Sequence, residues 1–138
     1  MMDVYVLDAC AMIAFLQNEA GADKVTAILT NARDGKCKIY MNVANLVEVY
    51  YDIFRAVGKA KADEEIAMIK KLPVVIQTEI TDNIFSEAGR FKASYKISFA
   101  DSFALAQAIV SSGELLTSDH HEFDVIEGKE AVRFLWIR

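Results

Sequence analysis

Short runs rich in β-branched and aromatic residues alternate with longer helix-like runs along the whole chain. The strand-like runs span residues 4–7, 38–41, 74–78, 115–117 and 132–137. The helix-like runs span residues 9–17, 20–32, 43–57, 62–72, 82–95 and 99–112, with Asn42, Thr81 and Ser98 as N-caps. Strands that alternate with helices imply parallel strands covered on both faces. The pattern therefore predicts an α/β fold, a three-layer α/β/α sandwich around a short, mainly parallel central sheet.

Size and composition indicate one domain. The 138 residues, 54% hydrophobic and 25% charged, suffice for a core of their own, so we expect a single domain over residues 1–138. Two cysteines, Cys10 and Cys37, are too few for a disulfide scaffold and favour a reducing compartment. No apolar run is long enough to cross a bilayer, and no basic residue precedes Lys24. These features predict a cytoplasmic protein without a membrane partner.

Three carboxylates stand alone in apolar stretches. Asp8 is the only charged residue from 4 to 18, Glu48 the only one from 39 to 51, and Asp101 the only one from 97 to 113. Stretches of this kind are mostly buried, and an ionised carboxylate there costs several kcal/mol unless it is paired or binds a metal. No basic partner is available within any of the three stretches, so a shared cation is the simplest counter-charge.

Asp119 is a fourth candidate, although nearby Asp124 is an alternative. Asp8 and Asp119 each follow closely on a short apolar strand, and ligands of open α/β sheets bind beyond the carboxyl ends of the strands. Asp101 comes three residues after Ser98, which is the spacing of a capping box and places the acid in a first helical turn. The four acids are therefore expected to point into one crevice.

The chemistry of such a cluster is that of a hard cation. Four oxygen donors without dedicated His or Cys partners suit one or two Mg²⁺ or Mn²⁺ ions per chain. Paired ions of this kind serve nucleases and phosphatases, which predicts phosphodiester hydrolysis leaving 5′-phosphate and 3′-hydroxyl ends. The net charge of −5 opposes nonspecific nucleic-acid binding, but without the four site acids it becomes −5 + 4 = −1.

Basic residues gather near two of the acids. Arg55, Lys59 and Lys61 follow Glu48, while Arg90, Lys92 and Lys96 precede Asp101. They are candidates for contacts with a phosphate backbone. The alternative is that each is part of an ordinary solvated helix or loop face.

Four short motifs carry a resemblance to a known family. They are Val6-Leu7-Asp8-Ala9, Asn45-Leu46-Val47-Glu48-Val49, Ser98-Phe99-Ala100-Asp101-Ser102, and Leu115-Leu116-Thr117-Ser118-Asp119 followed by Phe123. In this order and at this spacing they resemble a PIN domain, and most closely the VapC-like ribonuclease toxins of prokaryotic toxin–antitoxin pairs. The resemblance spans essentially the whole chain.

The resemblance implies a function and a set of residues. Asp8, Glu48, Asp101 and Asp119 match the family's acidic metal-binding quartet, and Thr117 matches a polar residue that supports it, as Ser98 is expected to do for Asp101. The implied activity is endoribonuclease cleavage with Mg²⁺ or Mn²⁺. The implied partners are RNA, a protein antitoxin and a second copy of the chain in a homodimer. His120 and His121 depart from the family, where a basic residue often follows the last acid; we expect them in a loop.

Each acid also has a purely structural reading. Asp8 and Asp101 fit helix caps. On the 43–57 helix, the main apolar face is predicted to hold Val43, Leu46, Val47, Tyr50, Phe54 and Val57. Glu48 lies away from that face, where a solvated side chain paired with Arg55 is the alternative. Val49 and Ile53 form a second apolar side, a candidate dimer or antitoxin surface unless the 62–72 helix buries it.

Two other functions compete with the nuclease. A PIN-like scaffold without catalysis would keep the fold but not the activity, which the four acids oppose. A phosphoacceptor receiver domain also binds Mg²⁺ beyond its strand ends. It needs adjacent acids after the first strand and a late lysine, and neither is evident here.

Overall fold

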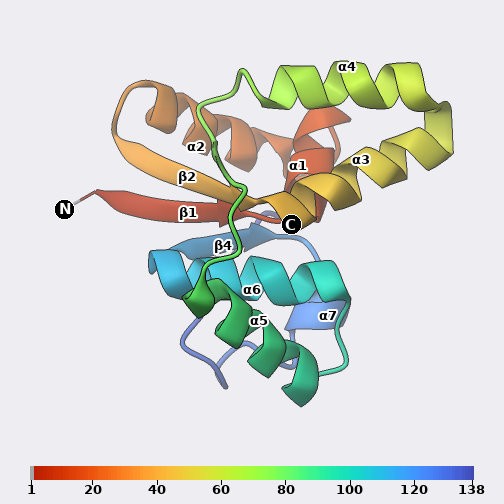
Figure 1. Ribbon diagram of the computed structural model, residues 1–138. Helices are drawn as coiled ribbons and strands as arrows, with labels where there is room; N and C mark the ends of the chain where they lie inside the picture. The colour runs from red at the N-terminus through yellow and green to blue at the C-terminus, as the bar shows by residue number, and fades with distance from the viewer. Residues whose placement is uncertain (1) are drawn as a thin grey trace.

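A five-stranded sheet lies at the centre of the protein, in a computed structural model that describes residues 2–138. The strands are β1 (Asp3–Leu7), β2 (Cys37–Asn42), β3 (Val75–Gln77), β4 (Glu114–Thr117) and β5 (Arg133–Trp136). Their order is β3-β2-β1-β4-β5, and every neighbouring pair is parallel. Figure 1 shows β1, β2 and β4 between the two layers of helices. The chain leaves β1 toward β2 on one side and returns as β4 on the other. The carboxyl ends of β1 and β4 therefore flank a topological switch point.

Helices cover both faces of this sheet. Figure 1 shows α1 (Ala9–Leu16), α2 (Ala22–Arg33), α3 (Val43–Val57) and α4 (Lys59–Ile69) on one face. The other face carries α5 (Asp82–Ser94), α6 (Phe99–Ser111) and α7 (His120–Phe123). The predicted three-layer α/β/α sandwich is confirmed. Among the helices between residues 2 and 138, none has both the length and the hydropathy that a transmembrane segment requires.

Alternation along the strands divides the core into two parts. Leu7 and Leu116 face the layer of α1 to α4, whereas their neighbours Val6 and Leu115 face α6 and α7. All four side chains are fully buried. A strand with apolar residues on both faces is characteristic of a parallel sheet between two helical layers. Such burial holds the ends of β1 and β4 rigidly in place.

Caps explain where most helices begin. The side chains of Asn42, Thr81 and Ser98 accept hydrogen bonds from the backbone N–H of Ala44 (2.9 Å), Ile84 (3.3 Å) and Asp101 (3.0 Å). These are the three predicted N-caps. The helix predicted over 62–72 is wrong at its start, because α4 begins at Lys59. Gly58 adopts φ +94°, a conformation that favours glycine, so the chain turns at one residue and the next helix starts at once.

The orientation of α3 differs from the prediction. Its buried residues are Asn45, Leu46, Val49 and Ile53, while Val47, Tyr51, Phe54 and Val57 are exposed. Val49 and Ile53 pack in the core with Ala62 and Ile69 of α4, so they do not form a dimer or antitoxin surface. The predicted main apolar face is wrong because α4 packs against α3 on the side of Val49 and Ile53. The wider aromatic side of α3 is left in solvent.

Candidate active site

Asp8 lies where β1 ends and α1 begins. One carboxylate oxygen, Oδ1, accepts a hydrogen bond from the Ala11 N–H at 2.8 Å, and Oδ2 accepts one from the Thr117 hydroxyl. Asp8 is thus the N-cap of α1, as its structural reading proposed, and only 2% of it is exposed. Burial is the main cause that raises its pKa to about 7, against the opposing effect of the two hydrogen bonds.

Thr117 joins the ends of two neighbouring strands. It is the last residue of β4, fully buried, and the pairing of Leu7 with Leu116 places it next to Asp8. Its Oγ1 donates to Asp8 and accepts from the backbone N–H of Asp119 at 3.0 Å. The hydroxyl therefore connects the acid after β1 with the acid after β4.

Asp101 lies in the first turn of α6 and is 6% exposed. Ser98 caps that turn, and its Oγ accepts a hydrogen bond from the Asp101 backbone N–H at 3.0 Å. The pKa of Asp101 rises to about 6, first because of burial and further because Asp119 and Glu122 add negative charge nearby; the bonds to Ser98 oppose the rise. Ser98 thus caps the turn that carries Asp101, as the capping-box spacing predicts.

Glu48 reaches the site from α3. It is partly buried, and burial together with the charges of Asp101, Asp52 and Asp119 raises its pKa to about 7. The alternative pairing with Arg55 is wrong, because the Arg55 guanidinium binds Asp52 at 3.0 Å. Glu48 and Asp101 influence each other across the space between α3 and α6.

Asp119 caps the short helix α7, accepting from the Glu122 N–H at 3.1 Å. The alternative acid, Asp124, instead contacts His120 Nδ1 at 2.7 Å and is exposed. His120 stacks on the Trp136 ring at 3.8 Å between centroids. The predicted loop at His120 is therefore wrong: a four-residue helix forms there, and it is too short for a periodic pattern to reveal.

The four acids form one electrostatic unit without a basic partner. Asp101 and Asp119 raise the pKa of Asp8, and the same two residues act on Glu48. None of the four acids makes an ion pair with Lys, Arg or His among residues 2–138. Asp8 and Asp119 cap helices and Asp101 lies in a first helical turn, but helix N-termini supply only partial positive charge. A bound cation would supply the rest.

An oxygen-only donor set of this kind fits a hydrated hard cation. In residues 2–138, no three His, Cys, Asp or Glu side chains are arranged to ligate an ion directly. Mg²⁺ does not require such a cage, because it is usually held by one or two carboxylates and keeps several waters. The residues therefore fit Mg²⁺ or Mn²⁺ by their chemistry and by their unbalanced charge.

The predicted basic residues are mostly engaged elsewhere. Lys59 binds Asp63 at 2.6 Å, and Arg90 binds Glu87 and Glu130 at 2.8 and 3.0 Å. Lys92 lines an apolar groove with Phe85 and Phe99, and Lys96 is exposed just before the first turn of α6. Lys96 is the closest of them in sequence to a site acid.

Two residues near the acids were assigned no site role from the sequence. Cys10 is half-buried beside the acids, whose charges together with burial raise the pKa of its thiol. Asn45 is fully buried one helical turn before Glu48, and it contacts the residue before Asp101. The sequence signal for Asn45 is its position: a polar residue in an apolar stretch, three residues before a candidate acid on the same helix.

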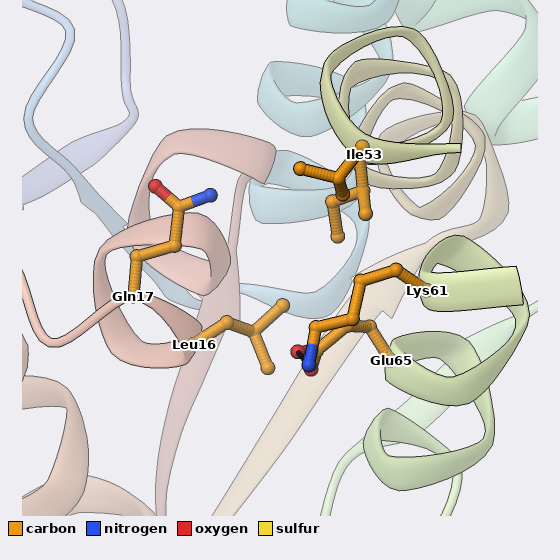
Figure 2. A pocket seen from close by; sticks show the side chains of 6 residues that line it. Leu16, Gln17, Ile53, Lys61 and Glu65 are labelled. Atoms are coloured by element: carbon orange, nitrogen blue, oxygen red, sulfur yellow. Dashed lines mark ion pairs between the residues drawn. The ribbon is translucent and has the colours of Figure 1, made fainter. Parts of the chain in front are cut away.

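Two hollows flank α3. One, of about 560 Å³, is lined by Tyr50, Tyr51, Phe54 and Arg55. The other, of about 520 Å³, lies between the end of α1 and the α3–α4 hairpin, and Figure 2 shows Leu16 and Ile53 on its walls with Lys61 and Glu65 of α4 side by side. Lys61 and Glu65 form an ion pair of 3.1 Å there.

Comparison with known proteins matches this geometry to a family. The PIN domain model matches residues 5–129. No curated protein matches the chain. Among solved structures, VapBC2 from Rickettsia felis, bound to promoter DNA, is 14% identical, with a TM-score of 0.72 and coverage of 96% of this chain and 98% of that one.

Two further structures are similar over nearly the full length. VapBC-1 from nontypeable Haemophilus influenzae is 18% identical with a TM-score of 0.71, covering 97% and 98% of the two chains. VapC20 of Mycobacterium tuberculosis, a Sarcin-Ricin loop cleaving toxin, is 15% identical with a TM-score of 0.66, covering 95% and 99%. The TM-scores establish a shared fold, and the family model covers all four acidic positions. The chain therefore belongs to the PIN domain family.

Proposed function

We propose that this protein is a metal-dependent endoribonuclease of the VapC toxin type. The observation that carries the proposal is the group of Asp8, Glu48, Asp101 and Asp119, gathered at the switch point of a parallel sheet with no basic partner among residues 2–138. Acids whose pKa values are raised by burial and by one another cluster at functional sites. Membership of the PIN family points to the same chemistry.

The four carboxylates would together hold one or two hydrated Mg²⁺ or Mn²⁺ ions, each ion through one or two carboxylates and several waters. Such an ion, when bound, lowers the pKa of water and neutralises charge on a phosphate. The chain orients the carboxylates: Thr117 fixes Asp8 and the backbone of Asp119, and Ser98 fixes Asp101. Hydrolysis that uses water, not the 2′-hydroxyl, leaves 5′-phosphate and 3′-hydroxyl ends.

An exposed aromatic surface next to the acids supports RNA as the substrate. Tyr51 lies one turn after Glu48 and is 44% exposed, and the Arg55 guanidinium lies 5.3 Å from the centre of its ring. Aromatic rings and guanidinium planes stack on unpaired bases. Lys96, Lys92 and other exposed bases would contact phosphates, and VapC20, of the same fold, cleaves the Sarcin-Ricin loop.

A protein antitoxin is the proposed partner. Structures of the same fold contain VapC with its antitoxin, as in the VapBC assemblies of Rickettsia felis and Haemophilus influenzae. The hollow in Figure 2 and the exposed Val47, Phe54 and Val57 leave apolar surface available to a second chain. A homodimer is part of the same proposal.

The test is cleavage of a panel of structured RNAs by purified protein with Mg²⁺, Mn²⁺ or EDTA. We expect metal-dependent cutting that leaves 5′-phosphates and is lost in Asp8→Asn and Asp101→Asn. Glu130→Gln, a change in a surface ion pair, is the matched control and should cut normally. Cutting that survives both substitutions, or that proceeds in EDTA, would contradict the proposal. No cutting by folded, antitoxin-free protein would favour the scaffold function.

A further inference from the structure

Two buried amide side chains join α3 to α6. Asn45 Nδ2 donates to the Ala100 carbonyl at 3.0 Å, and Asn42 Nδ2 donates to Gln107 Oε1 at 3.1 Å. Asn42 and Asn45 are fully buried, and Gln107 nearly so. The two contacts differ in position. Asn45 is one turn before Glu48 and bonds the residue next to Asp101. Gln107 instead lies in the second half of α6, and its partner Asn42 is the last residue of β2, beside the end of β1.

The Asn45 contact is not required to satisfy its acceptor. Ala100 lies in the first turn of α6, where a backbone carbonyl already accepts the helical bond from the residue four positions later. The bond from Asn45 is therefore additional. Loss of the Asn45 amide would not leave that carbonyl unsatisfied.

Asn45 is also a poor choice for stability. Its Oδ1 is the one buried side-chain oxygen or nitrogen in residues 2–138 without a hydrogen-bond partner. A buried acceptor left unpaired costs free energy, and an apolar side chain of similar size avoids that cost. Leucine has nearly the same shape as asparagine and suits the neighbours Leu46 and Val49. The geometry thus favours a role for Asn45 in placing α6 over a role in holding the fold.

We propose that Asn45 is a positioning residue of the acidic site. Its amide fixes the first turn of α6 against α3, and this sets how the Asp101 carboxylate faces that of Glu48. Ligand groups must be held to about 0.5 Å for tight binding, and residues behind the ligands commonly supply that precision. The inference rests on the proposed function in one respect, that these acids bind a divalent cation.

The experiment compares Asn45→Leu with Gln107→Leu in the full chain without RNA. Mn²⁺ affinity is measured by electron paramagnetic resonance, and thermal unfolding is followed in EDTA. Asn45→Leu should bind Mn²⁺ about 10- to 100-fold more weakly with an unchanged or higher unfolding temperature. Gln107→Leu removes the acceptor of a buried Asn42 amide, so its unfolding temperature should fall while Mn²⁺ affinity stays within about twofold of wild type.

Other results overturn the inference. Normal Mn²⁺ binding by Asn45→Leu, or equal weakening by both variants, would leave Asn45 a structural residue. Asn45→Ser, which also loses the bond but cannot overpack, should reproduce the weakened binding if Asn45→Leu is poorly folded. Wild-type protein that does not bind Mn²⁺ would overturn the inference outright. RNA cleavage is scored separately, so a wild type that binds Mn²⁺ without cutting RNA would refute the proposed function while leaving Asn45 to be decided.

Discussion

Two groups of carboxylates in this protein have opposite surroundings. At the end of the sheet, Asp8, Glu48 and Asp101 have raised pKa values, and burial is the first cause for each. Away from the sheet end, the exposed Asp63 and the partly buried Glu130 have lowered pKa values. The Asp63 carboxylate accepts hydrogen bonds from Lys59 at 2.6 Å and from the Tyr50 hydroxyl at 2.7 Å. The Glu130 carboxylate accepts hydrogen bonds from Arg90 at 3.0 Å and from the Tyr95 hydroxyl at 2.7 Å.

The difference separates acids that already have a cation and hydrogen-bond donors from acids whose negative charge is left without a partner. A surface carboxylate with a cation and a hydroxyl donor is complete as it stands, and it contributes modestly to stability. The acids at the sheet end are buried together, repel one another and destabilise the fold while they are ionised and unpaired. A bound cation would supply the positive charge that these acids lack and would remove this cost.

The sharpest test of this comparison is Asp8→Asn. Asparagine can still accept from Ala11 but cannot carry charge, so activity should fall by at least about 100-fold, as for loss of a metal ligand. In EDTA at pH 8 the same change should stabilise the fold by on the order of 1 kcal/mol, because it removes a buried charge whose pKa is shifted to about 7. Cleavage assays and thermal unfolding measure the two effects. A variant that lost both activity and stability would show that Asp8 is mainly a helix cap.

Thr117→Val should have the next largest effect. Valine keeps the shape but removes the hydroxyl that donates to Asp8 and accepts from the Asp119 N–H. We expect Mn²⁺ affinity to weaken by about 10- to 100-fold, since the orientation of both acids is lost. Titration of Mn²⁺ measures this. Thr117→Ser restores the hydroxyl and should recover most of the affinity; equal loss in both variants would contradict the role given to the hydroxyl.

The pH dependence of stability should also distinguish the two groups. Carboxyls whose folded pKa lies above the unfolded value stabilise the fold at low pH, and this contribution disappears as pH rises through the folded pKa. In EDTA, the unfolding temperature should therefore decrease between about pH 4 and pH 7, where Asp8, Glu48 and Asp101 ionise. Mg²⁺ should reverse the decrease above pH 7. A stability that rises steadily through this range would show that the acids are not desolvated.

Much of the fold could be predicted because its signals are local. The caps Asn42, Thr81 and Ser98 and the apolar strands are readable residue by residue, and so are the three isolated acids. The orientation of α3 could not be predicted. Both its sides are apolar, and only the return of α4 after Gly58 decides that Val49 and Ile53 are buried while Tyr51 and Phe54 face solvent.

The candidate site was only partly readable for a similar reason. Asp8, Glu48 and Asp101 could be identified as candidates because each is the only charge in an apolar stretch. Asp119 lies among other acids in the sequence, and only the different contacts of Asp119 and Asp124 in the structure distinguish the two. Asn45 carries no charge and sits within a regular helix. Its contact with Ala100 spans 55 residues of sequence, which no local pattern reports.

Asp63→Asn should have the smallest effect and so marks the limit of the comparison. Asp63 of α4 pairs with Lys59 of its own helix and accepts from the Tyr50 hydroxyl of α3 on an exposed surface. Its removal should therefore lower the unfolding temperature only slightly and leave Mn²⁺ binding unchanged. Because its pKa is lowered in the folded state, the small contribution it makes is present at neutral pH and is lost as pH falls through that lowered value. Asp63→Asn should therefore be slightly less stable than wild type at pH 7 and equal to it in acid, whereas Asp8→Asn in EDTA should be more stable than wild type at neutral pH. If Asp63→Asn weakened Mn²⁺ binding as much as Thr117→Val, the α3–α4 hairpin would itself be part of the site, and the division between the two groups of acids would not hold.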